Sequence, residues 1–387
     1  MSERMTAPAI RTASRAGMTF RASVLRAPRT PLATETVALT GLAARDVLVR
    51  IRAAGLCHTD LEVIDGGLRQ PFPIVLGHEA AGVVEAVGPE ARGVAVGDPV
   101  ILSWNPRCGA CFYCDRDLPI LCETYLANGP AAFGFDGAPK ARATGGADLS
   151  QLMYLGAFAE YCVVRDQQAV PIPREMPFDR AALIGCGVMT GVGAAINVAR
   201  VRPGMSVMVI GCGAVGLAAI QGAALAGAET IVAVDLRPGR LAAAAEMGAT
   251  HLANVNAAEA APAAVARDLT GGRGVDVVLE SAGNQPAFRL SVEAVRPGGQ
   301  VVWLGKTGVD EDVAFRWGSL MQEKRIRRSS YGDARPARDF PFLCRAYLDG
   351  RLRLDGLISE RIGLEDINQG FARLAAGETI RSVIVFD

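Results

Sequence analysis

Residues 55–88 read GLCHTDLEVIDGGLRQPFPIVLGHEAAGVVEAVG, and this stretch sets the expectations for the rest of the chain. Cys57 and His78 are ligand types that zinc prefers. The acidic residues Asp60 and Glu79 lie next to them in sequence, and such carboxylates commonly orient metal ligands. A buried thiol and a core histidine would be the simpler interpretation. However, the chain has only three histidines, and this one sits in Gly-His-Glu before a glycine-spaced apolar segment.

A third thiolate, Cys186, lies far down the chain in the run Gly-Cys-Gly. Two cysteines and one histidine leave the fourth tetrahedral position of zinc free for water or substrate. An open position is typical of a catalytic zinc, whereas a structural zinc has four protein ligands. The three residues therefore predict a catalytic metal site.

These motifs resemble those of the zinc-dependent alcohol dehydrogenases of the medium-chain dehydrogenase/reductase family. Gly77-His78-Glu79, followed by Gly82 and Gly88, matches the zinc signature of that family, and residues 57–60 match the segment that carries the first ligand. The resemblance covers residues 20–386. It implies an α/β protein with a β-rich GroES-like catalytic domain and a Rossmann domain with a doubly wound parallel sheet. It also implies a homodimer, with a tetramer as the alternative.

The composition excludes several function classes. The chain has 387 residues, with 40 basic and 40 acidic side chains, so no net field favours nucleic acid or a membrane surface. No apolar run approaches the roughly 20 residues that span a bilayer. The nine cysteines fall mostly into metal-like clusters, which favours a reducing, cytoplasmic setting over a disulfide scaffold.

The pattern of apolar runs divides the chain. Residues 1–18 are rich in Arg, Ala, Ser and Thr, and we expect a flexible tail, with a transit peptide as the alternative. Residues 19–187 form the expected catalytic domain, which 332–387 complete, and 188–331 form the Rossmann domain. Residues 123–153 show little periodicity, and we expect a long loop that serves as a lid or interface flap.

A compact lobe contains Cys108, Cys111, Cys114 and Cys122. Four thiolates at this spacing in a cytoplasmic chain indicate a structural zinc, because they leave no open coordination position. Two disulfides and an iron–sulfur cluster are the alternatives. The family resemblance supports zinc, since many members carry such a lobe.

The dinucleotide motif follows a buried strand expected at 206–210. Gly211, Gly213 and Gly216 form G-x-G-x-x-G at the entrance of a helix, and Asp235 ends the next strand. Glycines allow the backbone to approach a pyrophosphate at a helix N-terminus, and the acid accepts hydrogen bonds from a ribose 2′-hydroxyl. The spacing predicts NAD as the cofactor.

The resemblance implies roles for further residues. Cys57, His78 and Cys186 are the implied zinc ligands, with Glu79 behind the metal and Asp60 orienting the histidine. His58, whose cationic form would suit the contact, and Arg381 match positions that contact the cofactor pyrophosphate in relatives. Thr190 and Val215 match positions that line the nicotinamide, and Arg240 matches a basic residue near the adenosine ribose. Lys306 follows the strand expected at 300–305 and falls near the nicotinamide side of the cleft, although a surface lysine is the simpler interpretation.

The expected reaction is hydride transfer between an alcohol at the zinc and NAD⁺, with zinc as Lewis acid. By resemblance, Thr59 receives the alcohol proton and passes it on. The usual terminal histidine of this relay, three residues later, is replaced by Glu62. Glu62 is therefore either the relay base or a surface residue that leaves water as the acceptor.

Substrate identity is beyond the motifs. Leu68 and Leu126 stand where glutathione-dependent formaldehyde dehydrogenases carry charged residues, and Trp104 stands where relatives place an aromatic side chain of the substrate pocket. These positions favour a medium-chain or aromatic primary alcohol. Two alternatives stay open: a glutathione-dependent formaldehyde dehydrogenase, and an NAD- and zinc-binding protein without turnover.

Overall fold

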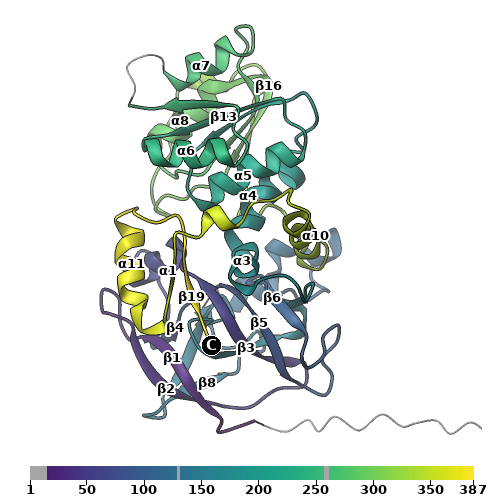
Figure 1. The fold of residues 1–387 in the computed structure, drawn as a ribbon, viewed down its shortest axis with the longest axis vertical. Helices are drawn as coiled ribbons and strands as arrows, with labels where there is room; N and C mark the ends of the chain where they lie inside the picture. Colours follow the sequence, from purple (N-terminus) through teal and green to yellow (C-terminus); the bar gives the residue numbers. More distant parts are fainter. Residues whose placement is uncertain (1–14, 129–130, 257–260) are drawn as a thin grey trace, which may run out of the picture.

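The computed structural model describes residues 15–128, 131–256 and 261–387, and this part of the chain folds into two lobes (Figure 1). The predicted tail thus lies almost wholly outside the described residues. The lower lobe in Figure 1 holds two sheets of mainly antiparallel strands, and the upper lobe holds a parallel sheet. This arrangement confirms the predicted fold class.

The first sheet of the lower lobe is built around the two N-terminal strands. Its strand order is β4 (Ile74–Val75), β1 (Thr19–Leu25), β2 (Ala33–Leu39), β8 (Ala141–Ala143), β9 (Asp148–Leu152) and β7 (Ala131–Ala132). The last three strands and helix α2 (Glu123–Asn128) occupy the segment where we expected a long loop. That expectation was wrong, because strands of two to five residues are too short to produce a readable alternation of apolar and polar residues.

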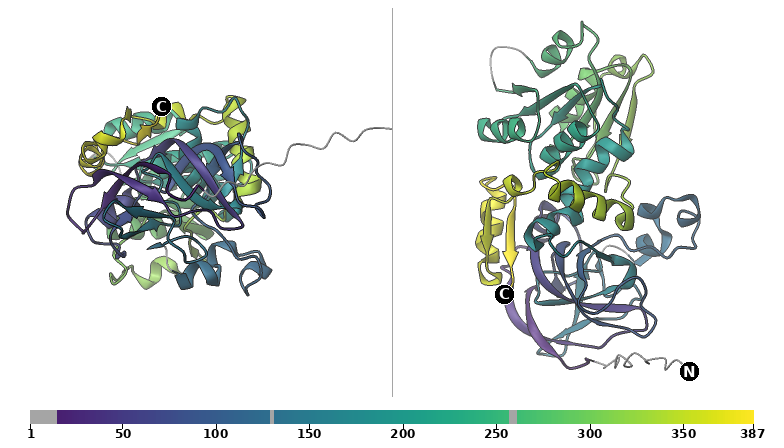
Figure 2. Two further views of the ribbon diagram at one scale, coloured as in Figure 1. Left: turned by 90° about the horizontal axis from the view of Figure 1, so that it is seen from below. Right: turned by 45° about the vertical axis from the view of Figure 1, so that its right-hand side comes forward.

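The second sheet carries the metal-site segment and is centred on the long strand β3. Its order is β11 (Ala169–Pro171), β6 (Pro99–Leu102), β5 (Glu79–Val87), β3 (Asp46–Gly55), β19 (Ser382–Val385) and β18 (Glu360–Ile362), and β10 (Tyr161–Arg165) also pairs with β3. Strand β19 belongs to the C-terminal segment and pairs antiparallel with β3. The end of the chain therefore returns to the lower lobe, where β19 lies beside helix α11 (Ile367–Ala375) (Figure 2). Helix α10 (Pro336–Leu348) packs near β11 instead.

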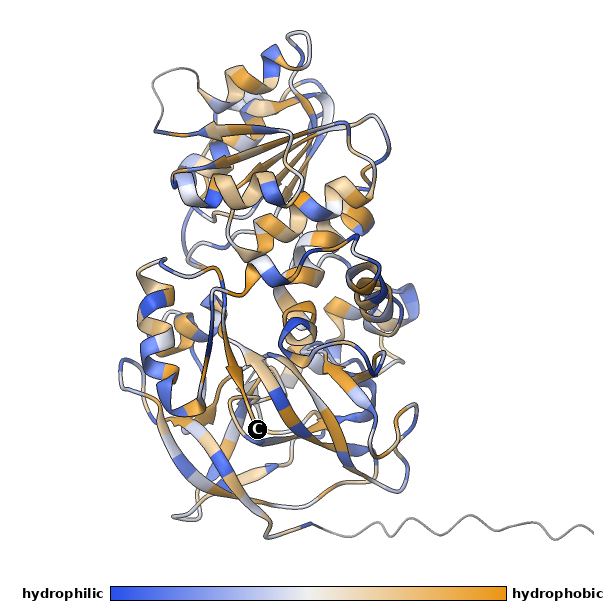
Figure 3. Cartoon of the chain, viewed as in Figure 1, coloured by the Kyte–Doolittle hydropathy of each residue, from blue (hydrophilic) through white to orange (hydrophobic). Residues whose placement is uncertain are grey.

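The upper lobe is a doubly wound sheet. Its order is β14 (His251–Asn254), β13 (Thr230–Asp235), β12 (Ser206–Ile210), β15 (Val275–Glu280), β16 (Val295–Trp303) and β17 (Arg325–Arg328), with every pair parallel. This is the dinucleotide-binding order 3-2-1-4-5-6, in which the ligand crevice opens where the order reverses. The surrounding helices are α5 (Ala214–Leu225), α6 (Pro238–Glu246), α7 (Pro262–Asp268) and α8 (Gln285–Ala294). The central strands are continuously apolar because helices cover both faces (Figure 3).

A helical stretch connects the lobes. It runs from α3 (Phe178–Leu183) through the π-helical segment η4 (Ile184–Val188) and α4 (Met189–Gly193) to η5 (Ala194–Val198). The 21 residues Phe178–Val198 are long and apolar enough to cross a membrane, which corrects our expectation that no run approached that length. Because 83% of the most apolar window is buried inside the protein, the stretch has the character of a core helix.

Candidate active site

Four potential metal ligands meet where the two lobes join. Cys57 is the N-cap of α1 (His58–Ile64), and His78 and Glu79 lie at the start of β5. The run Gly-Cys-Gly predicts Cys186 at a helix entrance, but the residue lies in η4, in the middle of the connecting helix. One ligand atom from each of the four residues lies within 4.8 Å of the others. The structure thus brings together residues that are far apart in sequence.

The histidine of this cluster has the geometry of a metal ligand. His78 is 1% exposed, and its Nδ1 lies 3.2 Å from the Asp60 carboxylate. Its Nε2 is buried and has no hydrogen-bond partner within the described part of the chain. A buried polar nitrogen normally has a partner. A metal ion bound by the cluster would supply one, so the residues fit the zinc that the sequence predicts.

Asp60 holds the two ligand-bearing segments together. Its Oδ1 accepts a hydrogen bond from the backbone N–H of Gly77 at 2.9 Å, and its Oδ2 accepts one from the N–H of Cys57 at 3.2 Å. The same carboxylate contacts His78. One fully buried side chain therefore fixes the backbone on both sides of the cluster and the orientation of the imidazole, as an orienting residue requires.

Behind the cluster lies a buried ion pair. Arg381 Nη2 is 2.9 Å from Glu79 Oε1, and its guanidinium also donates to the Cys57 sulfur at 3.5 Å. Burial raises the pKa of Glu79 to about 7, although the positive charge of Arg381 opposes this shift. The predicted contact between Arg381 and a pyrophosphate stays a prediction, since the described contacts of its guanidinium are with the metal cluster.

The two thiols of the cluster differ in acidity. A hydrogen bond from the Cys186 side chain lowers the pKa of Cys57 well below its ordinary value, and the charge of Arg381 adds to this effect. Cys57 is therefore the thiol that ionises first. Since thiolates rather than thiols bind metals, Cys57 is prepared for coordination by its surroundings.

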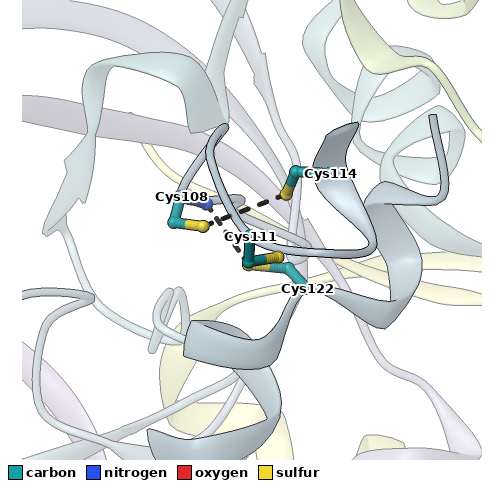
Figure 4. A group of neighbouring side chains, drawn as sticks. All are labelled: Cys108, Cys111, Cys114 and Cys122. Carbon is teal, nitrogen blue, oxygen red and sulfur yellow. Dashed lines mark hydrogen bonds between the residues drawn. The ribbon is translucent and has the colours of Figure 1, made fainter. Parts of the chain in front are cut away.

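The four cysteines of the lobe form a second cluster (Figure 4). The potential ligand atoms of Cys108, Cys111, Cys114 and Cys122 all lie within 4.8 Å of one another. The sulfurs of Cys108 and Cys114 are 4.0 Å apart, about twice the length of a disulfide bond, and all four thiols are free. The disulfide alternative is thus not what the structure contains. A backbone hydrogen bond at Ala110 lowers the pKa of Cys108 to about 6, which favours a thiolate.

The glycine motif forms a cradle at the N-terminus of α5. A Cβ at Gly216 would lie 1.8 Å from the carbonyl oxygen of Gly211, so this close approach of helix and strand requires glycine. A Cβ at Gly213, the N-cap of the helix, would meet nothing within 4 Å. The space beside Gly213 is open to a ligand, and an anionic group there would face the positive end of the helix.

Asp235 lies at the end of β13, as predicted, and is largely buried. Its oxygens accept hydrogen bonds from the backbone N–H groups of Cys212 at 2.7 Å and Arg237 at 2.9 Å. The carboxylate therefore links the glycine motif to the turn after β13. The guanidinium of Arg237 donates to the carbonyl oxygens of Ala376 and Gly377 and so contacts the C-terminal segment.

One cavity of about 1540 Å³ connects the metal cluster to the glycine motif. Its walls include most of the residues that the sequence assigned to zinc and the cofactor, among them Cys57, His78, Cys186, His58, Thr190, Val215, Arg240, Lys306 and Arg381. Burial lowers the pKa of His58, so the cationic form that we expected for a pyrophosphate contact is disfavoured. A neutral imidazole can still donate one hydrogen bond.

Three polar side chains meet beside the metal cluster. Lys306 Nζ donates to Thr59 Oγ1 at 3.2 Å and to Glu62 Oε2 at 2.7 Å. The structure thus places Glu62 in an ion pair at the mouth of the cleft, with its side chain 39% exposed. The sequence suggests a proton relay through Thr59 and Glu62 and, separately, a place near the cofactor for Lys306. No spacing in the sequence indicates that Lys306 contacts the other two residues.

The far wall of the cavity is apolar and aromatic. Trp104 stacks on Tyr331, with 4.2 Å between the ring centroids, and Tyr125 lies next to Trp104. Leu68 and Leu126 line the same cavity. At these two positions the sequence offers no charged side chain that could bind glutathione. Sequence reasoning missed the two tyrosines and the lobe residues Leu118, Ile120 and Leu121, which also line it.

Comparisons with known proteins match parts of both lobes. The family model of the alcohol dehydrogenase GroES-like domain matches residues 43–174, and the model of the zinc-binding dehydrogenase matches 214–345. The chain is 37% identical to the NDMA-dependent alcohol dehydrogenase of Amycolatopsis methanolica, covering 95% of this chain and 99% of that protein. It is 34% identical to the S-(hydroxymethyl)glutathione dehydrogenase of Aspergillus oryzae, covering 95% and 96%.

Solved structures give the same result. An alcohol dehydrogenase zinc-binding domain protein from Burkholderia ambifaria has a TM-score of 0.90 and 37% identity, covering 96% of this chain and 99% of that one. The benzyl alcohol dehydrogenase of Acinetobacter calcoaceticus has a TM-score of 0.87 and 31% identity, covering 96% and 100%. Similarity at this level extends over both lobes.

Proposed function

Because the chain belongs to the zinc-dependent alcohol dehydrogenases of the medium-chain dehydrogenase/reductase family, we propose that Cys57, His78 and Cys186 hold its catalytic zinc. The enzyme interconverts an alcohol and its aldehyde, with NAD as the hydride carrier and zinc as a bound metal. One observation carries the assignment of the site. The three ligand atoms and Glu79 lie within 4.8 Å of one another, in the same cavity as the glycine motif.

The residues of the chain divide the work of this reaction. When bound, zinc supplies Lewis acidity toward the alcohol oxygen and NAD⁺ takes up the hydride. Asp60 fixes the imidazole of His78, and the pair Arg381–Glu79 balances charge behind the metal cluster. Thr59, two residues after Cys57, accepts the hydroxyl proton of the alcohol. The apolar far wall excludes water from the reacting centre.

For the cofactor we propose contacts on both sides of the cleft. Gly211, Gly213 and Gly216 admit the pyrophosphate, and Asp235 with Arg240 recognises the adenosine ribose. Thr190 and Val215 line the nicotinamide side, while His58 and Arg381 border the pyrophosphate. Lys306 lies on the nicotinamide side too, but its amine is held by Thr59 and Glu62. His58 and Arg381 belong to the lower lobe, Thr190 lies on the connecting helix, and the others lie on the upper lobe. We propose domain limits of 19–187 with 332–387 and 188–331, a boundary that falls within the connecting helix.

We propose a medium-chain or aromatic primary alcohol as the substrate. The wall formed by Trp104, Tyr125, Leu126 and Leu68 offers apolar contact and no charge for the carboxylates of glutathione. The second candidate, S-(hydroxymethyl)glutathione, is favoured only by relatives that bear this name. We also propose that the four-cysteine lobe binds a structural zinc, for which its closed set of thiols is suited.

A substrate panel tests the function. The purified enzyme is assayed for NADH absorbance with benzyl alcohol, hexanol and a terpenoid alcohol, and with formaldehyde in the presence and absence of glutathione. Each assay is repeated with NDMA, because one relative is NDMA-dependent. We expect turnover of the apolar alcohols that Cys57→Ser abolishes. Formaldehyde oxidation that requires glutathione would support the second candidate. Binding of NAD and zinc without any turnover would support a non-catalytic protein.

We further propose that the enzyme is a cytoplasmic homodimer. All nine cysteines are free, as a reducing compartment favours. Strand β17 is one edge of the parallel sheet, and the nearby side chains of Trp317 and Val309 are 79% and 96% exposed. An unpaired strand edge beside large exposed apolar side chains is suited to a symmetric contact with a second copy.

A further inference from the structure

A hydrogen-bonded chain of three side chains leads from the metal cluster to the cavity mouth. Lys306 Nζ lies 3.2 Å from Thr59 Oγ1 and 2.7 Å from Glu62 Oε2, and all three residues line the cavity. Thr59 is two residues from the proposed ligand Cys57. At the other end, the Glu62 side chain is 39% exposed and the Lys306 side chain 43%. The chain therefore runs from a half-buried hydroxyl beside a proposed metal ligand to two side chains in contact with solvent.

The contact crosses the cleft between the lobes. Thr59 and Glu62 both lie on helix α1 of the lower lobe, whereas Lys306 follows strand β16 of the upper lobe. The backbone of Lys306 is packed closely against Gly283, where an added Cβ would lie 2.4 Å from the Lys306 carbonyl oxygen. The anchor of the side chain is thus fixed, and its flexible stem reaches across to the other lobe.

The identity of this residue is informative in a chain that rarely uses lysine. Of the 40 basic residues, three are lysines and the rest are arginines. An arginine could form the same ion pair and stays protonated under all working conditions, whereas a lysine amine can lose and regain a proton. A site that only needed positive charge would be served equally well by the residue that the chain uses elsewhere.

We propose that Lys306 is the middle member of the proton path out of the active site, between Thr59 and Glu62. This inference rests on the proposed function and deepens it, because the oxidation of an alcohol releases one proton that must leave the cleft. Lys306 acts through Thr59 rather than on the substrate itself. It occupies the gap that the missing relay histidine leaves between the threonine and solvent.

The transfer is balanced without a change in electron count. Lys306 passes an N–H proton to Glu62 Oε2, which leaves a neutral amine. The amine lone pair accepts the hydroxyl proton of Thr59 as Thr59 takes up the proton of the alcohol. Glu62 then releases its proton to water. One proton enters the chain at Thr59, one leaves at Glu62, and all three side chains return to their starting states.

Three other roles for Lys306 predict different measurements. A surface ion pair alone contributes about 0–1 kcal/mol to stability and leaves the rate unchanged. A contact to the cofactor would change the KM for NAD⁺, and a purely electrostatic role would be retained by arginine. The variants Lys306→Arg and Lys306→Ala therefore separate these roles from proton transfer.

The experiment compares these variants with the wild-type holoenzyme in steady-state and stopped-flow alcohol oxidation. Arg316→Ala is the matched control, because Arg316 is another cation of the upper lobe in an ion pair, with Glu293. A pH indicator reports proton release and absorbance reports NADH. Binding of NAD⁺ is measured separately by titration, so that cofactor affinity is known independently of activity.

We expect kcat to fall about 100-fold in both Lys306 variants, at the lower end of the range for general acid–base groups. Proton release should lag behind NADH formation, and the affinity for NAD⁺ should change less than about twofold. Added ethylamine should restore part of the rate of Lys306→Ala but not of Lys306→Arg. Arg316→Ala should behave as wild type.

Wild-type kcat in Lys306→Arg would overturn the relay and leave a role for charge alone. A change confined to the KM for NAD⁺ would overturn it in favour of a cofactor contact. These results are distinguishable from failure of the proposed function, in which the wild-type enzyme itself would oxidise no alcohol with NAD⁺.

Discussion

Asp60 makes three contacts at once, and each holds a part of the metal cluster in place. Its carboxylate accepts hydrogen bonds from the N–H groups of Gly77 and Cys57 and contacts Nδ1 of His78. We predict that Asp60→Asn weakens zinc binding at the catalytic site about 10- to 100-fold, the usual effect of losing such an orienting residue. The amide cannot accept at both of its heavy atoms, so one N–H loses its partner.

Competition with a chromogenic zinc chelator measures this change. Asp65→Asn is the matched control, because Asp65 lies at the exposed C-terminal end of the same helix. Equal zinc affinity in the two variants would remove Asp60 from the metal site and leave it a role in backbone packing only.

The second prediction at the residue scale concerns Asp235 and the preference for NAD⁺ over NADP⁺. The carboxylate would accept hydrogen bonds from a ribose 2′-hydroxyl and repel a 2′-phosphate. We predict that Asp235→Ser shifts the ratio of kcat/KM for NAD⁺ and NADP⁺ toward NADP⁺ by about 10-fold, which corresponds to about 1.4 kcal/mol. Arg237 and Arg240 lie at the same end of the cavity and would receive the added phosphate.

Steady-state kinetics with both cofactors give this ratio. Asp235 also binds the backbone of Cys212 and Arg237, so a loosened loop would lower both kcat/KM values together. Asp268→Ser, at the exposed end of α7, serves as the control. A wild-type enzyme that already prefers NADP⁺ would contradict the role given to Asp235.

Single residues show most clearly what can and cannot be predicted from the sequence. Cys57, His78 and the glycines stand in local motifs, so their chemistry could be read from short spacings. The contact of Lys306 with Thr59 joins residues 247 positions apart and depends on how the two lobes meet. No periodicity or motif in the sequence indicates that these two residues are in contact. The burial that lowers the pKa of His58 is equally a property of the folded cleft.

At the scale of elements, strong patterns were predicted and weak ones were missed. The buried strands of the parallel sheet and the helix after Gly213 carry long apolar runs, and the structure has them where the sequence placed them. A helix that runs through Gly185 and Gly187 could not be predicted from the sequence, because glycine disfavours helix interiors. In the structure, these glycines lie in a π-helical turn that keeps the helix continuous around Cys186.

The cysteine lobe is an element without a core of its own. Phe112 and Leu118 within it are more than a third exposed, so metal binding must supply much of its stability. We predict that Cys111→Ser lowers the zinc content from two ions to one per chain and lowers Tm by several degrees. Because Leu118, Ile120 and Leu121 line the substrate cavity, the KM for the alcohol should also rise.

Metal analysis and thermal unfolding check this prediction together. Cys162→Ala is the control, since Cys162 is buried and lies outside both clusters. It should lose some packing energy but keep both zinc ions. A fully active wild-type enzyme with one zinc per chain would contradict the two-site assignment.

At the scale of the whole molecule, the C-terminal strand β19 joins the last part of the chain to the central strand β3 of the lower lobe. Strand β19 pairs with β3 after the chain has left the parallel sheet, so the lower lobe is complete only when the last residues are in place. The cleft is therefore bordered by lower-lobe segments that precede the upper lobe in the sequence and by segments that follow it. The active site, which takes Cys57 from one segment and Arg381 from another, depends on this return.

The opposite faces of the upper lobe differ in what they offer to a second copy. Trp317 and Val309, both largely exposed, precede edge strand β17 in the chain, whereas β14 forms the other edge and carries Leu252, which is half-exposed. We predict that the enzyme elutes as two chains of 40.5 kDa and that Trp317→Glu shifts it toward one. A charge at a buried contact would cost more than the apolar area it replaces could offset.

Size-exclusion chromatography with light scattering measures the mass of both states. Leu252→Glu is the matched control, because it adds the same charge to the opposite edge of the same sheet and should leave the mass unchanged. If Leu252→Glu alone produced monomers, the contact would lie along β14. A monomeric wild-type enzyme would reject the homodimer, whereas a mass of four chains retained in Trp317→Glu would mean that another surface holds the assembly together.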